Sequence, residues 1–227
     1  MLRPPLPILA LLVAAAPAPS PLRGQATGVV EGTLTVATRP ARMTASRYPA
    51  GIIAAKGMQE VPAVVYLMGE GLSASGAAGS EPAVDVVQRD TAFAPAAVAI
   101  RTGTVVRFPN ADPFYHNVFS YAGNARFDLG RYPEGELRQV TFAEPGIAHV
   151  YCEVHEFMRA VVVVTDHPFH AVVGDDGAFR LDGVPVGRYT LVAYHPDLGP
   201  LERDVTVSAG QRVALELDLG GAPPPGR

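Results

Sequence analysis

Apolar and polar residues alternate in short runs along most of the chain, and glycine- and proline-rich turns separate these runs. A period of two is typical of strands, and no segment shows the 3.6-residue apolar period of an amphipathic helix. The pattern therefore predicts an all-β protein. Residues 41–59 are compatible with a long loop or with a short helix. The expected strands are residues 29–38, 61–68, 83–88, 97–100, 104–108, 138–142, 147–151, 159–165, 178–181, 188–194, 202–208 and 212–219.

The first 26 residues have the features of a secretory signal peptide. Arg3 precedes a short apolar run that prolines interrupt, and Gly24, Gln25 and Ala26 form a small-residue cleavage signature. The run is shorter than the roughly 20 residues that a membrane span needs, and no later segment reaches that length without charge or glycine. We therefore expect an exported, periplasmic protein that is cleaved near Ala26 and has no membrane span.

The charge of the chain limits its partners. The full sequence has 18 Lys and Arg residues against 22 Asp and Glu residues, a net charge of −4. Loss of Arg3 and Arg23 with the leader would leave 16 basic residues against 22 acidic ones, a net charge of −6. Nucleic acid binds basic surfaces and is therefore not an expected partner.

Cys152 is the only cysteine, so it cannot form a disulfide within the chain, although exported proteins commonly use cysteine in that way. It ends an expected strand on the same small apolar face as Ala148 and Val150. His155 and Met158 follow three and six residues later, where the alternation stops, which indicates a tight loop at the strand end. Cys152 is therefore either a buried small hydrophobic residue or a ligand.

A thiolate, an imidazole and a thioether form the soft ligand set of a type 1 copper site, in which two histidines and one cysteine lie in a plane with a weak axial methionine. Such a site needs a second histidine from elsewhere in the chain. The segment NADPFYHNVFS, residues 110–120, offers His116 after a strand and a proline turn. Copper is thus a candidate cofactor, bound by His116 and by the Cys152 loop.

The other histidines give no comparable pattern. His149 lies on the strand face opposite Cys152 and is expected at the surface. A second metal at His167, His170 and His195 has no carboxylate or ligand spacing to support it. Hydrolase, metalloprotease and phosphate-loop motifs are absent from the sequence, and a Cys-His-His-Met site leaves no open position for a substrate. We therefore do not expect an enzyme.

Residues 83–166 resemble a cupredoxin over its whole length. The resemblance rests on VVQRDTAFAPAAVAIRTGTVVRFPNADPFYHNVFS and FAEPGIAHVYCEVHEFMRAVVVV, whose C-x2-H-x2-M loop is similar to that of amicyanin and of methylamine-utilisation-type cupredoxin-like proteins. It implies a Greek-key β-sandwich with one type 1 copper, and it implies that Asn117 joins the two ligand loops by hydrogen bonds. Val154 and Glu156 stand where amicyanin-like loops carry prolines, a departure that affects loop rigidity but not the ligand set. The implied copper ligands are His116, Cys152, His155 and Met158.

Residues 170–219 are similar to the later strands of a transthyretin-like, carboxypeptidase-regulatory β-sandwich, with its pattern D-x-G-x-F…P-x-G-x-Y. The opening strands of such a domain are found much earlier, at residues 30–34 and 64–67. We therefore expect one discontinuous sandwich with the cupredoxin inserted into a hairpin. The alternative is two consecutive domains, with the N-terminal strands added to the cupredoxin. The expected parts are a signal peptide (1–26), N-terminal sandwich strands (27–70), a linker (71–82), the cupredoxin (83–166), the remaining sandwich strands (167–219) and a tail (220–227).

Three classes of function remain. The favoured one is a periplasmic one-electron carrier with a protein redox partner, such as a c-type cytochrome or a periplasmic dehydrogenase. Copper delivery or storage, and a non-redox binding module, are the alternatives. Glu153 and Glu156 flank His155. They indicate either a partner with a basic surface or only an exposed loop tip that charge keeps soluble.

Overall fold

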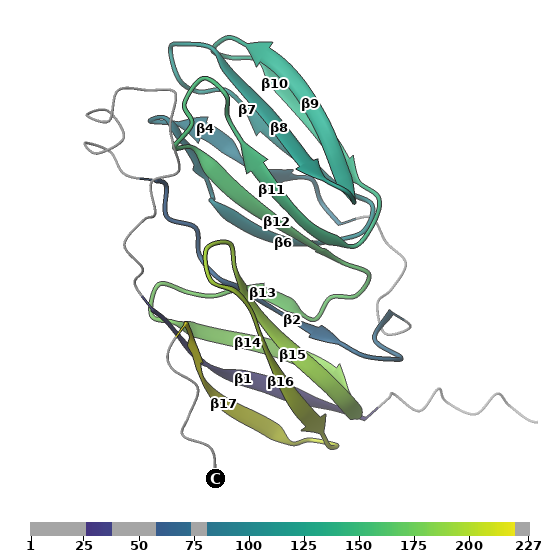
Figure 1. Cartoon of the computed structure of the whole chain (residues 1–227). Coiled ribbons are helices and arrows are strands. Elements are labelled where there is room, and N and C mark those ends of the chain that lie inside the picture. The colour runs from purple at the N-terminus through teal and green to yellow at the C-terminus, as the bar shows by residue number, and fades with distance from the viewer. Residues whose placement is uncertain (1–25, 38–57, 74–80, 221–227) are drawn as a thin grey trace, which may run out of the picture.

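The computed structural model describes residues 26–37, 58–73 and 81–220 (Figure 1). Nearly all of the expected signal peptide and tail, most of the unassigned segment 41–59 and most of the linker lie outside these described residues. Within them every regular element is a β-strand, which confirms the all-β prediction. No helix in these described ranges is long and apolar enough to cross a membrane.

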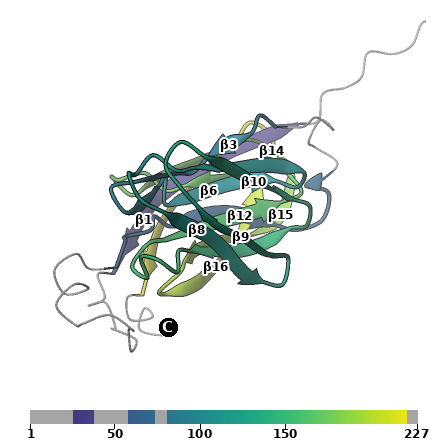
Figure 2. The same cartoon turned by 90° about the horizontal axis from the view of Figure 1, so that it is seen from above.

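The strands form two β-sandwiches, one above the other in Figure 1. Figure 2, seen from above, shows the upper sandwich lying over the lower one. The upper or first sandwich contains β3 (Val84–Asp85), β4 (Val87–Arg89), β5 (Ala92–Ala94), β6 (Ala97–Arg101), β7 (Thr104–Pro109), β8 (His116–Ala122), β9 (Ala125–Tyr132), β10 (Leu137–Phe142), β11 (Gly146–Tyr151) and β12 (Arg159–Thr165). The lower or second sandwich contains β1 (Thr27–Val36), β2 (Val64–Met68), β13 (His170–Val172), β14 (Ala178–Pro185), β15 (Gly187–His195), β16 (Gly199–Val207) and β17 (Arg212–Leu219).

The first sandwich encloses one apolar core between a sheet of order β6-β12-β11-β8-β9 and a smaller sheet of order β10-β7-β3. As the alternation predicts, Ala148 and Val150 of β11 face this core and are fully buried. Cys152 continues the same face and is 2% exposed. The regular alternation of the strand thus places the Cys152 sulfur in the interior, at the end of β11.

The second sandwich is made of chain segments that lie on either side of the first. β1 pairs with β14 and β17, and β2 pairs with β13 and β15. The two N-terminal strands therefore hydrogen-bond with strands that follow residue 169, as the insertion hypothesis requires, and together these strands enclose a second core. Gly32 allows the close pairing of β1 and β17, because a Cβ atom there would lie 2.1 Å from the Leu215 carbonyl oxygen.

Four strands were not expected from the sequence: β5, β8, β9 and β13. The hairpin β8–β9 is the largest of these differences. In β9 the partly buried Phe127 and Leu129 alternate with exposed polar residues, but Gly130 and Arg131 interrupt the pattern. The apolar signal is therefore weak, although β9 pairs with β8 on both sides of an irregularity between Asn117 and Phe119.

A third apolar cluster joins the two sandwiches through the outer faces of β6 and β12. His149, expected at the surface, lies beside this interface: its Nε2 is 2.8 Å from the Tyr194 hydroxyl oxygen, and its ring stacks on Tyr151. That expectation was wrong because the second sandwich covers part of a sheet face that would otherwise contact water. The buried members of the cluster are Val61, Val64, Ala97, Val161 and Val163.

His170 at the start of β13 is held in its neutral form. The Thr165 hydroxyl donates to the carbonyl oxygen of His167 at 2.7 Å, so His170 Nδ1–H must donate to Thr165 Oγ1 at 2.6 Å. Burial lowers the pKa of His170 to about 4; Glu81 opposes the shift, and His167 and Arg101 reinforce it. The folded state therefore resists protonation of this histidine.

This shift predicts acid destabilisation of the metal-free protein. Between pH 6.5, the ordinary histidine pKa, and pH 4, the unfolded chain binds the proton and the folded chain does not, so the free energy of unfolding falls as the pH falls. We expect His170 to account for a loss of about 1–2 kcal/mol between pH 7 and pH 5. Urea unfolding of the wild type and of His170→Gln at both pH values measures the contribution of His170 to this loss of unfolding free energy. An equal pH dependence in the two proteins would contradict it.

Candidate metal centre

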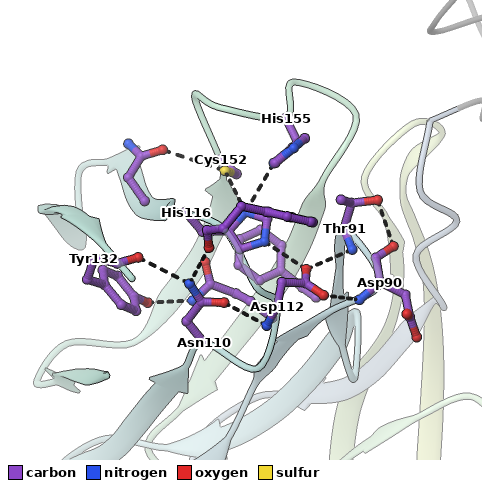
Figure 3. A network of polar contacts seen from close by, with 12 residues as sticks. Asp90, Thr91, Asn110, Asp112, His116, Tyr132, Cys152 and His155 are labelled. Atoms are coloured by element: carbon purple, nitrogen blue, oxygen red, sulfur yellow. Dashed lines mark hydrogen bonds and ion pairs between the residues drawn. The ribbon is translucent and has the colours of Figure 1, made fainter. Parts of the chain in front are cut away.

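Three of the four ligands expected from the sequence, His116, Cys152 and His155, converge at one end of the first sandwich (Figure 3). His116 is the first residue of β8, and Cys152 directly follows β11. The short loop that carries His155 and Met158 then returns the chain to β12. His116 and Met158 are fully buried, whereas His155 is partly exposed.

The donor atoms have the spacing of a metal site. His116 Nδ1 lies 3.1 Å from His155 Nδ1 and 3.6 Å from Cys152 Sγ. Two atoms bound to one ion at about 2.0–2.3 Å, with bond angles of about 100–110°, are separated by about 3.1–3.6 Å. Among the described residues this is the one group of histidine, cysteine and acidic side chains close enough to hold a metal. The chemistry and the spacing of the donor set therefore fit copper.

Met158 lies in the same buried cluster as Cys152, and its N–H donates to the His155 carbonyl oxygen at 2.9 Å. The loop is thus closed by its own hydrogen bond, and the Met158 side chain belongs to the core that also contains Cys152. The weak axial bond assigned to Met158 from the resemblance stays a prediction. His167, His170 and His195, whose spacing does not favour a second metal site, do not form a metal-binding group among the described residues.

Asp112 is a site residue that the sequence analysis missed. Its Oδ2 lies 2.8 Å from His116 Nε2, and its side chain is largely buried. The carboxylate also accepts the N–H of Asp90 at 2.7 Å and of Thr91 at 2.9 Å. Burial raises the pKa of Asp112, but the hydrogen bonds from Thr91, His116 and Asp90 outweigh it and hold that pKa below its ordinary value. The ionised carboxylate therefore keeps the proton on Nε2 and leaves Nδ1 free for a metal.

Asn117 joins the two ligand segments, as the resemblance implies. Its Oδ1 accepts the Glu153 N–H at 2.7 Å and lies 3.6 Å from Cys152 Sγ. Burial raises the pKa of the Cys152 thiol, and backbone N–H groups of Asn117, His155 and Val154 offset this only partly. The metal-free site therefore holds a thiol, and binding of a metal ion must displace its proton.

Comparison with known proteins assigns both sandwiches to families. Residues 81–165 match the family model "Copper binding proteins, plastocyanin/azurin family", and residues 157–220 match "Carboxypeptidase regulatory-like domain". The chain therefore contains a plastocyanin/azurin-type copper-binding domain and a carboxypeptidase regulatory-like domain, as expected. The second match does not include β1 and β2, which complete that sandwich from the N-terminal side.

Several solved structures resemble the copper-binding part. A Cu-containing nitrite reductase from Thermus scotoductus SA-01 is 26% identical (TM-score 0.36), over 38% of this chain and 23% of the enzyme. A reduced mutant of amicyanin is 25% identical (TM-score 0.35), over 44% of this chain and 98% of amicyanin. A purple cupredoxin from Nitrosopumilus maritimus is 22% identical (TM-score 0.33), over 36% of this chain and 99% of that protein. No curated protein matches the chain.

Asp112 gives a direct test of the site geometry. In Asp112→Asn the amide nitrogen cannot accept a hydrogen bond, so either His116 or the Asp90–Thr91 turn loses its partner. We expect Cu(I) affinity to fall about 10- to 100-fold in competition with a chelator. Asp85→Asn, which alters an exposed carboxylate paired with Arg107, is the matched control. Equal affinities in the wild type and Asp112→Asn would show that the carboxylate does not orient the ligand.

Proposed function

We propose that this protein is an exported, periplasmic type 1 copper protein that carries one electron at a time between redox partners. The observation that supports this most directly is the convergence of His116 Nδ1, Cys152 Sγ and His155 Nδ1 within 4.8 Å of one another in a plastocyanin/azurin-type domain. Met158 completes the proposed ligand set, with one copper per chain. Copper bound there would supply a one-electron Cu(II)/Cu(I) couple. The proposed location rests on the leader-like first 26 residues.

The chain itself provides a dry and preformed ligand cage. His116 and Met158 are fully buried, so water is excluded from most of the site. Asp112 and Asn117 fix the positions of the histidine and of the cysteine loop by hydrogen bonds, so the ligands need to move little between the two oxidation states. Copper delivery or storage would favour exposed ligands, and catalysis would need an open coordination position. Burial of the ligands therefore favours a carrier.

His155 is the ligand nearest to solvent and marks the proposed route for electrons. Phe114, which is 40% exposed, packs against the rings of His116 and His155 at 5.2 and 5.3 Å between centroids. Tyr115 beside it is 58% exposed. Phe157, two residues after His155, is only 7% exposed and packs in the core, so it contributes little to this surface. The proposed port is therefore formed by residues that precede His116.

The proposed partner has a basic surface and is a redox protein such as a c-type cytochrome or a periplasmic dehydrogenase. Glu153 and Glu156 line one cavity of about 420 Å³ together with Asp128 and Cys152. Arg131 lies 3.4 Å from Glu153, so part of this negative charge is compensated within the protein. Acidic groups beside the sulfur would speed the encounter with a cationic partner.

The copper site can be tested by its spectrum. The purified protein with Cu(II) should bind one copper per chain, show an intense thiolate-to-copper absorption band and unfold at a higher temperature, because copper bound to the folded state stabilises it. Cys152→Ser should abolish the band. Met158→Leu should keep the band and shift the reduction potential, as expected for a weak axial ligand. A pale spectrum that Cys152→Ser leaves unchanged would reject the electron-carrier function.

The partner surface can be tested by ionic strength. Electron transfer to a basic cytochrome should slow in Glu153→Gln/Glu156→Gln, and its rate should fall less steeply with salt than in the wild type, since salt screens exposed charges beyond about 10 Å at 0.1 M. Glu216→Gln/Asp218→Asn in β17 removes the same charge from exposed positions on the second sandwich and should behave like the wild type. Equal rates and equal salt dependences in all three proteins would exclude a role for the two glutamates in partner choice.

A further inference from the structure

The end of the copper-ligand loop is held by residues that lie outside the copper-binding domain. Residues 153–158 contain no proline, which would fix the backbone angle φ, so contacts must hold the loop in place. One contact is internal, from the Met158 N–H to the His155 carbonyl oxygen. Asn117 holds the start of the loop through the Glu153 N–H. The end of the loop is held by Gln59, in the segment that leads into β2, and, through Arg159, by Asp197 in the β15–β16 turn.

Gln59 fixes the end of the loop through its backbone and its side chain. Its N–H donates to the Phe157 carbonyl oxygen at 3.0 Å. Its Oε1 accepts the N–H of Phe93 at 3.0 Å and of Arg159 at 3.3 Å, and its Nε2 donates to the Phe93 carbonyl oxygen at 2.5 Å. The side-chain amide therefore bridges β5 and the residue that follows Met158.

Arg159 extends this contact into the second sandwich. Its Nε donates to the Gln59 carbonyl oxygen at 2.8 Å, and its two terminal nitrogens donate to the Asp197 carboxylate at 2.5 and 2.6 Å. A bidentate arginine–carboxylate pair is strong and directional, and the Arg159 side chain is only 17% exposed. The hydrogen bond from Arg159 is the main cause that lowers the pKa of Asp197. In Figure 1 the β15–β16 turn projects from the second sandwich towards the first.

We propose that the carboxypeptidase regulatory-like domain acts as a clamp on the copper-ligand loop. Gln59 binds Phe157, the residue before Met158, and Asp197 binds Arg159, the residue after it. These contacts fix the backbone of Met158, and Met158 in turn is hydrogen-bonded to His155. Gln59 and Asp197 are positioning residues, since neither contacts the metal-binding atoms. The clamp gives the second sandwich a role in positioning the metal ligands. The part of this proposal that concerns copper rests on the proposed function.

Hydrogen exchange of the metal-free protein tests the clamp without copper. Asp197→Asn and Gln59→Ala should each speed exchange of the Met158 and Arg159 amides by about fivefold, while amides in the core strands β7 and β17 stay unchanged. Asp182→Asn is the matched control, because Asp182 forms a bidentate pair with Arg180 on the same domain, away from the loop. If the Met158 and Arg159 amides exchange at the wild-type rate in both Asp197→Asn and Gln59→Ala, the proposal is wrong.

The copper-loaded protein provides a second readout. Asp197→Asn should release Cu(I) to a chelator about fivefold faster and change the reduction potential and the copper hyperfine splitting, whereas Asp197→Glu should recover part of the wild-type behaviour. Unaltered release, potential and splitting in Asp197→Asn would also overturn it. A wild type that lacks the thiolate band would reject type 1 copper, but the exchange experiment would still decide whether the clamp exists.

Discussion

The hydrogen bond between Asp112 and His116 links the metal centre to the rest of the first sandwich. A charged carboxylate that is 4% exposed costs several kcal/mol unless it is paired, and here the imidazole and two backbone N–H groups pair it. The N–H groups come from Asp90 and Thr91, which form the β4–β5 turn with φ of 55° at both positions. Such angles are unfavourable for residues other than glycine, and for β-branched Thr91 above all. The carboxylate therefore stabilises a strained turn, and the turn in return stabilises the buried charge that orients the histidine.

The same chain of contacts explains what the sequence could and could not predict. Cys152, His155 and Met158 could be found because they follow one another closely after a strand whose alternation is regular, and His116 because a type 1 site requires a second histidine. Asp112 was missed because its role depends on a turn about 20 residues earlier, and no local pattern connects the two. Its position four residues before His116, in the same loop, was the available signal. The ligands are specified locally, whereas the groups that orient them are specified by the tertiary fold.

The organisation of the two sandwiches also combines features that local sequence motifs specify with features that only the tertiary fold specifies. The strands that complete the second sandwich could be recognised by their motifs on either side of the copper-binding segment, and the observed pairing of β1 and β2 agrees with this. The environment of His149 could not be recognised, because alternation along β11 shows only which residues share a face. The outer face of an antiparallel sheet commonly contacts water, but the second sandwich covers part of this one. A sequence pattern within one domain carries no information about the surface that another domain buries.

Insertion also determines how firmly the two sandwiches are held together. Two domains in tandem are joined by one connection, but here the chain leaves the second sandwich after β2 and returns to it at β13, so two connections fix the relative orientation. The apolar cluster of β6 and β12 joins the two sandwiches, and the Arg159–Asp197 pair is a further contact between them. β12 therefore belongs to the packing of both sandwiches. Its inner face packs in the copper-binding core, and its outer face packs against the second sandwich. Its first residue directly follows Met158. A displacement of the second sandwich would therefore act on β12 and on the end of the ligand loop that β12 follows.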